Sequence, residues 1–338
     1  MNKKEKSKTM LGVIIAIIII GFFVCLMMIN LVIGAIIYVA ALATLLIVAL
    51  NKGNKPVKQQ NKENVKKEIK NKEKLDTIIN EIKKRTEAEY YKINLVDEPT
   101  NIYSSKIGGL PYWEKDKEYP IDSKGNKLSL LAQINFEKEN FDDERLPKTG
   151  ILQFFIGDDD LYGCNFDDVQ NDWRVIYHEK IKENISEEEI NLMNIPTNKT
   201  VEDGPIEKNI NSLAMKFIKE KCYITTNSYN FESLIKNILM EKYNEEVTEK
   251  FLFFHFGDPE YEYIINSFEA FGHKLLGYPD FYQSDTRKLD SKYDTLLLQI
   301  DTDKGIMWGD SGVCNFFINN EDLKKKDFSN VLYNWDCT

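Results

Sequence analysis

Residues 90–338 of the 338-residue chain contain short apolar runs separated by turns that are rich in Gly and Pro. The runs are rich in aromatic and β-branched residues, which is typical of strands. They lie at residues 128–136, 151–156, 173–177, 252–256, 296–300 and 313–318. Short runs joined by turns are typical of antiparallel sheets. The pattern therefore predicts a mainly β body of the α+β class.

Two segments between these runs have helical periodicity, because their apolar residues recur three and four positions apart. The first face comprises Ile210, Leu213, Ala214, Phe217 and Ile218, and the second comprises Phe231, Leu234, Ile235, Ile238 and Leu239. This spacing predicts a helical insert at about residues 205–246. No flexible linker divides the strands before the insert from those after it, so we expect both sets to share one core.

The N-terminal part has a different pattern, with no charged residue from Met10 to Leu50. As one helix this run would extend about 60 Å, twice the roughly 30 Å hydrocarbon core of a bilayer. Two spans at residues 10–28 and 31–50 fit better, and lysines flank both ends of the run. Because loops rich in Lys and Arg face the cytoplasm, this favours a two-helix transmembrane hairpin, with residues 1–9 and the C-terminal domain both cytoplasmic. A single tilted span is the alternative.

The hairpin makes the lipid bilayer an expected partner through residues 10–50, and it predicts a multi-pass protein of the cell membrane. Residues 51–89 would then form a basic juxtamembrane linker. Apolar residues recur there at spacings near three and four, which predicts a charged helix with a narrow apolar stripe. They are Val65, Ile69, Leu75, Ile78, Ile79 and Ile82. A solvated stalk or short coiled coil is one interpretation, and a polybasic segment on anionic lipid is the other.

Three short motifs occur twice in the same order, at offsets of 168, 166 and 150 residues. They are Lys-x-x-Gly-x-Pro at Lys106 and Lys274, Gln-Ile at Gln133 and Gln299, and Cys-Asn-Phe at Cys164 and Cys314. Self-similarity of this kind indicates one structural unit used twice. The sequence therefore predicts a body of two similar halves, at about residues 100–180 and 250–325.

The charge is unevenly distributed along the chain. Residues 1–89 carry sixteen basic and eight acidic side chains, a net charge of +8. Because the whole chain has a net charge of −10, residues 90–338 carry −18. An acidic domain is a poor nucleic-acid binder, since phosphate contacts need clustered Lys and Arg. The five cysteines include no C-x-x-C pair and no zinc spacing. A protein or small-molecule partner of basic character is the better expectation.

A polar cluster around the second Gly/Pro turn is the strongest candidate site. It offers acid, base and hydrogen-bonding groups, with Tyr278 and Tyr282 as potential walls. Lys106 would face Lys274 across the axis that relates the two halves. The candidate ligand-binding residues are Lys106, His273, Lys274, Tyr278, Gln283, Asp285 and Arg287. The competing interpretation is a loop held in place by its own polar side chains.

The sequence identifies no catalytic residue, metal site or cofactor. Residues 309–312, Gly-Asp-Ser-Gly, imitate a serine-protease nucleophile loop, but the three histidines lie in no recognisable catalytic motif. A tight turn is the better interpretation. Asp301 and Asp303 begin like a calcium loop, yet Gly305 and Gly312 stand where that loop needs oxygen ligands.

Seven motifs between residues 90 and 338 keep the order that is found in the YwqG-like family, a bacterial family of unknown function. They lie at residues 106–112, 130–136, 146–156, 273–281, 296–301, 308–312 and 315–318. The resemblance implies a mainly β, roll-like fold and no established catalytic residues. Some relatives are encoded near polymorphic toxin genes, which makes an immunity protein one functional hypothesis.

The favoured hypothesis is a membrane-anchored, cytoplasm-facing binding or interaction module. The rival is a hydrolase or transferase that uses the polar cluster at residues 273–287, and the immunity protein is a third. The residues leave open whether the domain is an enzyme.

Overall fold

One ten-stranded sheet dominates the described part of the chain, and its neighbouring strands are antiparallel. The computed structural model describes residues 69–165, 169–268, 271–287 and 291–338. The strands are β1 (Ala88–Val96), β2 (Lys106–Ile107), β3 (Ser129–Asn135), β4 (Ile151–Ile156), β5 (Trp173–His178), β6 (Leu213–Cys222), β7 (His273–Leu275), β8 (Thr295–Asp301), β9 (Val313–Ile318) and β10 (Val331–Asp336). Their order in the sheet is β10-β9-β8-β7-β1-β6-β2-β3-β4-β5. The prediction of a mainly β body is confirmed.

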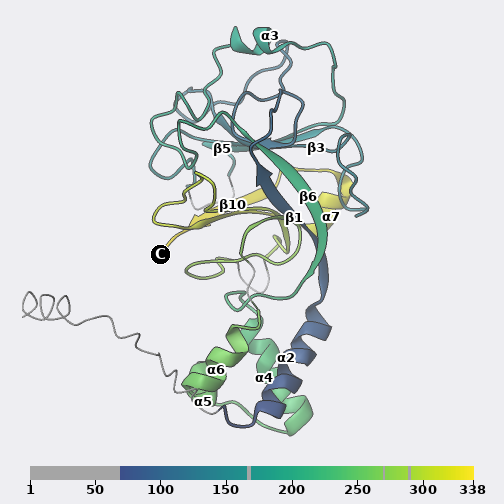
Figure 1. Ribbon diagram of the computed structural model, residues 1–338, viewed down its shortest axis with the longest axis vertical. Coiled ribbons are helices and arrows are strands. Elements are labelled where there is room, and N and C mark those ends of the chain that lie inside the picture. Colours follow the sequence, from purple (N-terminus) through teal and green to yellow (C-terminus); the bar gives the residue numbers. More distant parts are fainter. Residues whose placement is uncertain (1–68, 166–168, 269–270, 288–290) are drawn as a thin grey trace, which may run out of the picture. The chain divides into compact units, whose positions relative to one another are not determined.

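Two long strands, β1 and β6, form the centre of this sheet. They pair along their shared length, from Ala88 opposite Cys222 to Val96 opposite Ala214. On its other side β1 pairs with β7, and β6 pairs with β2. Strands β2–β5 and β7–β10 therefore extend from the central pair as two half-sheets, and Figure 1 shows β3 and β5 in one layer and β10 in the other.

The two half-sheets have the same register. Lys106 on β2 lies opposite Gln133 on β3, and Lys274 on β7 lies opposite Gln299 on β8. The register of β3 against β4 shifts between residues 130 and 132, and that of β8 against β9 shifts between residues 296 and 298. The duplication at about residues 100–180 and 250–325 stays a prediction, and these matches support it.

The third sequence match does not belong to the repeat. Cys314 lies on β9 opposite Ile300, whereas Cys164 lies after the end of β4 and outside any strand. By register the residue that matches Asn315 is Gln153, because Gln153 lies opposite Gln133 and Asn315 lies opposite Gln299. The Cys-Asn-Phe correspondence was therefore wrong, and it reflects two buried cysteines in different structural roles.

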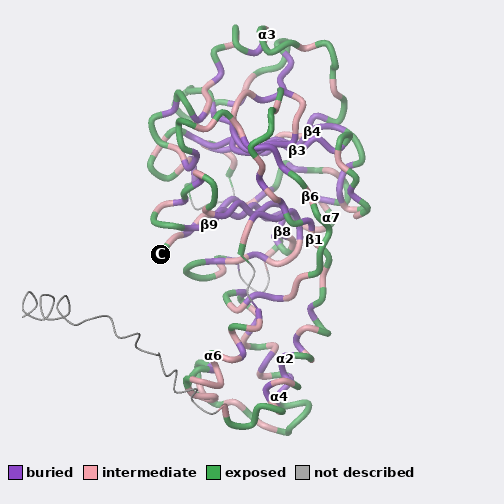
Figure 2. The backbone as a smooth tube through the Cα atoms, in the orientation of Figure 1, coloured by how far each residue is buried: buried purple, intermediate pink, exposed green. Residues whose placement is uncertain are grey.

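The main hydrophobic core contains side chains of both half-sheets, and Figure 2 shows the strands as the most buried part of the fold. Leu152, Phe154 and Trp173 come from the first half-sheet, and Phe316 and Tyr333 come from the second. The opposite face of each half-sheet carries its own smaller apolar cluster, one around Phe155 and one around Phe317. The sheet is thus covered on both faces.

Side chains connect strand β10 at one edge of the sheet to the segment that joins β4 and β5. The Trp335 indole nitrogen donates to the carbonyl oxygen of Leu161 at 2.9 Å. The Gln170 amide donates to the carbonyl oxygen of Phe328 at 3.2 Å, just before β10. The two ends of the sheet therefore approach each other without forming a strand ladder between them.

The helices of the described chain are α2 (Lys72–Thr86), α3 (Glu187–Asn191), α4 (Phe231–Tyr243), α5 (Leu252–Phe256), α6 (Asp258–Ile265) and α7 (Asn320–Lys325). Four of them, α2, α4, α5 and α6, share a second apolar core. The stripe on α2 consists of buried residues Leu75, Ile78, Ile79 and Ile82. Residues 72–86 are therefore a packed helix and neither a solvated stalk nor a coiled coil, while residues 51–68 lie outside the described residues.

Strands 128–136, 151–156, 173–177, 296–300 and 313–318 and the helix at 231–239 are confirmed. The helix predicted from Ile210 to Ile218 is wrong, because residues 213–222 form β6 and pair with β1. The strand predicted at residues 252–256 is wrong too, because this run is helix α5, which buries Leu252 and exposes Phe254. The predicted helical insert therefore begins later than expected. Strands β1 and β10 were missed because charged and amide side chains interrupt their apolar residues.

The predicted transmembrane part of the fold requires correction. Among residues 69–338 with the gaps given above, no helix is long and apolar enough to cross a membrane. The longest described helix, α2, has 15 residues and extends about 22 Å, less than a hydrocarbon core of roughly 30 Å. The predicted spans at residues 10–28 and 31–50 lie outside the described residues. The two-helix hairpin, the membrane anchoring and the multi-pass localisation are therefore not supported.

The packing of α2 gives a first testable prediction. The Ile78 side chain is fully buried in the core that α2 shares with α4. We expect Ile78→Ala to lower the free energy of unfolding by about 2–4 kcal/mol, because it leaves a cavity in a closely packed core. Urea unfolding followed by tryptophan fluorescence measures the change. The exposed Lys84→Ala on the same helix is the control, and equal stability of the two variants would show that α2 is not part of the folded body.

Candidate functional site

Each half-sheet holds the loop beside it with a buried glutamine. The Gln133 amide donates to the carbonyl oxygen of Ser104 at 2.9 Å and accepts from the backbone N–H of Tyr112 at 2.9 Å. Gln299 does the same, since it donates to Gly272 at 2.8 Å and accepts from the backbone N–H of Asp280 at 2.7 Å. The two glutamines therefore lie in matching surroundings.

The two buried lysines, each directly opposite one of these glutamines, hold the same loops. Lys106 donates from Nζ to the carbonyl oxygens of Asn101 and Leu110, at 2.8 and 2.6 Å. Lys274 donates from Nζ to the carbonyl oxygen of Tyr278 at 3.2 Å. Each amino group therefore serves the loop of its own half, and the two do not meet across a shared cleft. Burial lowers the pKa of both lysines to about 8.

The turn after Lys274 depends on glycine. Gly277 has a φ of +80°, and a Cβ there would come within 2.8 Å of Cys222 Sγ and Tyr90 Cβ. Only glycine adopts this conformation without strain and fits so close to β1 and β6. The loop that follows, with Tyr278 and Pro279, is thereby fixed against the central strands.

The other predicted site residues lie in separate contacts. His273 accepts a hydrogen bond at Nδ1 from the backbone N–H of Asp301, at 3.0 Å. Gln283 donates from its side chain to the carbonyl oxygen of Cys337, at 3.0 Å. Asp285 and Arg287 form an ion pair at 2.8 Å. Of the seven predicted residues, Tyr278 and Arg287 line one cavity together, and the other five are not part of its lining.

This cavity has a volume of about 190 Å³, and we call it the arginine cavity. Six parts of the chain form its wall: the start of β1, the loop before β4, the residues leading into α4, the loop around the Gly277 turn, the segment that carries Arg287, and the start of β8. Its lining residues are 88–89, 145, 228–230, 277–279, 287 and 294–296. Side chains from both halves of the chain therefore converge there.

Two arginines at this cavity have the same local geometry. Arg145 Nε and Nη2 donate to Asp143 at 3.0 and 2.6 Å. Arg287 Nε and Nη2 donate to Asp285 at 2.9 and 2.8 Å. In both pairs the arginine backbone N–H also donates to the same aspartate, two residues earlier. Sequence reasoning missed Arg145, although the Asp-x-Arg spacing that it shares with Arg287 was a readable signal.

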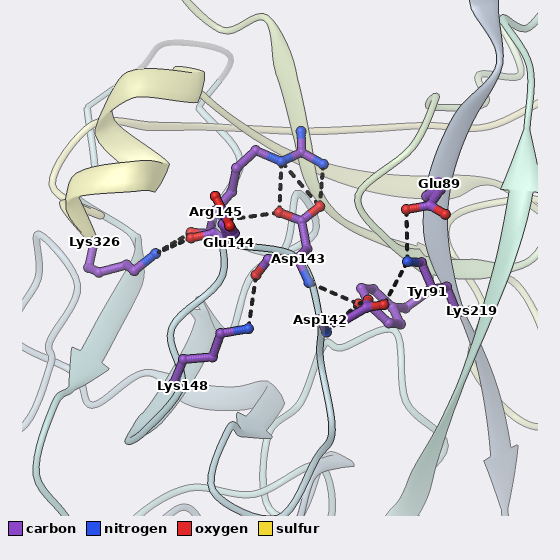
Figure 3. Close-up of polar contacts among 9 residues, drawn as sticks. All are labelled: Glu89, Tyr91, Asp142, Asp143, Glu144, Arg145, Lys148, Lys219 and Lys326. Carbon is purple, nitrogen blue, oxygen red and sulfur yellow. Dashed lines mark hydrogen bonds and ion pairs between the residues drawn. The ribbon is translucent and has the colours of Figure 1, made fainter.

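The segment around Arg145 is held by contacts on several sides, as Figure 3 shows. The Tyr91 hydroxyl accepts from the backbone N–H groups of Asp142 and Asp143, at 2.8 and 3.2 Å. Lys148 donates to the carbonyl oxygen of Phe141 at 2.7 Å, and Lys326 donates to that of Arg145 at 2.5 Å. Arg145 is therefore presented by a fixed loop, with Nη1 pointing away from the Asp143 carboxylate in Figure 3.

Arg287 is more deeply buried than Arg145. Its side chain is 5% exposed, and that of Asp285 is 1% exposed. Its guanidinium stacks over the Phe317 ring at 4.2 Å and over the Tyr229 ring at 5.5 Å. Nη1 donates to the carbonyl oxygen of Tyr293 at 3.3 Å. Arg287 therefore anchors the wall of the cavity, whereas Arg145 has the freer guanidinium edge.

The residues that lead into α4 also line the cavity. Ser228, Tyr229 and the cap residue Asn230 belong to its lining. The Asn230 side chain makes no capping hydrogen bond to the first turn of the helix. Two backbone N–H groups of this segment are already used, because that of Tyr229 donates to Asp285 at 3.4 Å and that of Phe231 donates to the Ser228 carbonyl oxygen at 3.0 Å.

The described residues contain no group of three or more His, Cys, Asp or Glu side chains placed to hold a metal ion. The Ser311 turn has a φ of +78° at the serine, and the Gly312 N–H donates to the Trp308 carbonyl oxygen at 2.7 Å. This is the tight turn that the sequence favours over a nucleophile loop. What the geometry offers is a set of hydrogen-bond donors and aromatic faces, which suits binding.

Fold and site together define a mainly β domain with two matching half-sheets and a polar cavity that both halves line. Residues 105–337 match the family described as a domain of unknown function, DUF1963, so the chain belongs to that family. No curated protein matches the chain.

Proposed function

We propose that this domain is a non-enzymatic binding module that takes a small ligand with an anionic group, a carboxylate or a phosphate, in the arginine cavity. One observation carries the proposal. Arg145 and Arg287 come from distant parts of the chain, and each is held by the same Asp-x-Arg fork at one cavity. Guanidinium groups fixed in this way are typical of carboxylate and phosphate recognition.

Short-range donors, and not overall charge, would provide the affinity. Each arginine is balanced by its own aspartate, and residues 90–338 are acidic as a whole. The free edge of Arg145 supplies N–H groups, and Tyr229 and Tyr278, which also line the cavity, supply aromatic surface. The basic partner expected from the net charge of −18 would bind elsewhere, and it stays a prediction.

The arrangement supports binding better than catalysis. A nucleophilic mechanism needs a nucleophile, a base and an orienting group within hydrogen-bonding reach of one another. His273 and Lys274 are buried, and they contact the Asp301 backbone and the loop at Tyr278. Asp285 and Arg287 bind each other. The narrower YwqG-like assignment and the immunity role stay predictions.

Arg145→Gln tests this function. We expect half-saturation by inorganic phosphate or by small dicarboxylates, measured by chemical shifts of backbone amides, to require about tenfold more ligand, because a charge-assisted hydrogen bond is worth about 1.5–3 kcal/mol. Arg174→Gln is the matched control, since Arg174 also follows an Asp-x-Arg spacing but does not line the cavity. Equal binding by wild type and Arg145→Gln would contradict the proposal.

A further inference from the structure

In the first half-sheet, a histidine on β5 completes the hydrogen bonds of a buried glutamine on β4. Gln153 on β4 donates from Nε2 to the carbonyl oxygen of Tyr112 at 2.7 Å. Its Oε1 lies 2.9 Å from Nε2 of His178 on β5. Burial lowers the pKa of His178 to about 4, so the ring is neutral near pH 7 and its Nε2–H can donate to the amide oxygen. Both polar atoms of the Gln153 amide and Nε2 of His178 thus have partners.

The second half-sheet has different residues at the same positions. By register Asn315 on β9 replaces Gln153, and Asp336 on β10 replaces His178. Asn315 keeps the first contact, because its Nδ2 donates to the carbonyl oxygen of Asp280 at 2.9 Å. The donor that His178 provides in the first half is replaced by a carboxylate, which only accepts when it is ionised.

Three polar atoms in this part of the second half have no hydrogen-bond partner. They are Asn315 Oδ1, Asn334 Nδ2 and Asp336 Oδ1. The three residues are buried, with exposures of 0, 5 and 8%. Asn334 lies directly opposite Asn315, and Asp336 lies two residues further along β10, so all three side chains share one face of the sheet. Buried polar atoms without partners are rare and costly.

The unpaired oxygen atoms of this cluster favour a positively charged ligand. Asn315 Oδ1 and Asp336 Oδ1 are both acceptors, and rotation of the Asn334 amide would turn its carbonyl oxygen toward them. Asp280 lies beside the cluster, because its carbonyl oxygen accepts from Asn315 Nδ2. The other oxygen of Asp336 is already used, because it accepts from the Gln283 N–H at 2.8 Å.

We propose that Asn315, Asn334 and Asp336, with the neighbouring Asp280, form a binding site for a hard cation such as Ca²⁺. Amide and carboxylate oxygens are the ligands that Ca²⁺ prefers, whereas zinc prefers nitrogen and sulfur. The site is specific to the second half, because His178 fills the equivalent position in the first half. It is independent of the arginine cavity, and neither Asn315 nor Asp336 lines that cavity.

Terbium luminescence tests this site, because Tb³⁺ occupies calcium sites and is sensitised by nearby aromatic rings such as Trp335. We expect Tb³⁺ emission that Ca²⁺ competes away, and a melting temperature that rises with Ca²⁺. Asp336→Asn keeps an acceptor for the Gln283 N–H but removes the charge, and we expect it to weaken binding at least about tenfold. The control is Asp310→Asn, which removes an exposed carboxylate of the adjacent turn and should bind like wild type.

A second variant separates loss of binding from loss of folding. Asn315→Gln combined with Asp336→His reproduces the pair that closes the first half. We expect this protein to fold, as shown by its circular dichroism, and to give no Tb³⁺ emission that Ca²⁺ displaces. The proposal is overturned if wild type shows no such emission, or if Asp336→Asn and Asp310→Asn bind equally well.

Discussion

Replacing Arg287 with methionine is expected to lower the free energy of unfolding by about 3–5 kcal/mol. The variant leaves the Asp285 carboxylate, whose side chain is 1% exposed, without its cationic partner. It also removes the guanidinium that stacks on Phe317 and donates to the Tyr293 carbonyl oxygen. A buried charge without a partner costs far more than the pair itself contributes. Urea unfolding at pH 7 measures the loss.

The double variant Asp285→Asn, Arg287→Met is the informative control. It removes both charges, so it should recover a large part of the lost stability if the unpaired carboxylate is the cause. The half-buried loop pair Arg145 and Asp143 provides a comparison, because Arg145→Met should cost about 1 kcal/mol or less at a partly solvated site. A double variant as unstable as Arg287→Met would show that lost packing, and not the charge, dominates.

The sequence predicts the strands well where the apolar residues leave only one interpretation. Residues 151–156 and 313–318 are short runs of β-branched and aromatic residues, and both are fully buried strands. Residues 213–222 are ambiguous, since Leu213 and Phe217 fit a helix while Leu213, Met215 and Phe217 fit a strand. Residues 213–222 form a strand because they pair with β1, which lies more than a hundred residues away in the sequence. Local periodicity does not contain that information.

The sequence predicts part of the candidate site. Tyr278 and Arg287 follow a Gly/Pro turn and were recognisable from the sequence as potential cavity residues. Arg145 was harder to recognise, because it follows Asp142, Asp143 and Glu144 as in a solvated acidic loop, and only its Asp-x-Arg spacing distinguished it. The contacts that fix it come from Tyr91, Lys148 and Lys326. Two of those three are distant in sequence, so only the fold brings them together.

The two half-sheets share their buried lysine and glutamine pairs and differ in the polar pair beside them. Lysines 106 and 274 and the glutamines opposite them are placed alike, down to the loop atoms that they bind. The polar pair next to them is Gln153 with His178 in one half and Asn315 with Asp336 in the other. The shared lysines fix loops of the fold. The pair that differs, Asn315 with Asp336, is the one that we propose as part of a cation site.

The two shared lysines should make the free energy of unfolding depend on pH. Burial lowers the pKa of Lys106 and Lys274 from 10.5 to about 8 in the folded chain. Between pH 8 and 10.5 the unfolded chain binds more protons than the folded one, so the free energy of unfolding should rise with pH across this window. Below pH 8 both states are protonated and the cost of the buried charges is fully present. The gain should reach up to about 3 kcal/mol for each lysine.

Urea unfolding at intervals from about pH 7 to 9.5 measures this slope, because tyrosine ionisation opposes it at higher pH. Lys274→Met and Lys106→Met should each remove about half of the rise, and the double variant should abolish it. The exposed Lys208→Met should leave it unchanged. A full slope in the double variant would mean that other groups cause it. Unequal effects of the single variants would instead mean that the two halves, although placed alike, do not bury their lysines at equal cost.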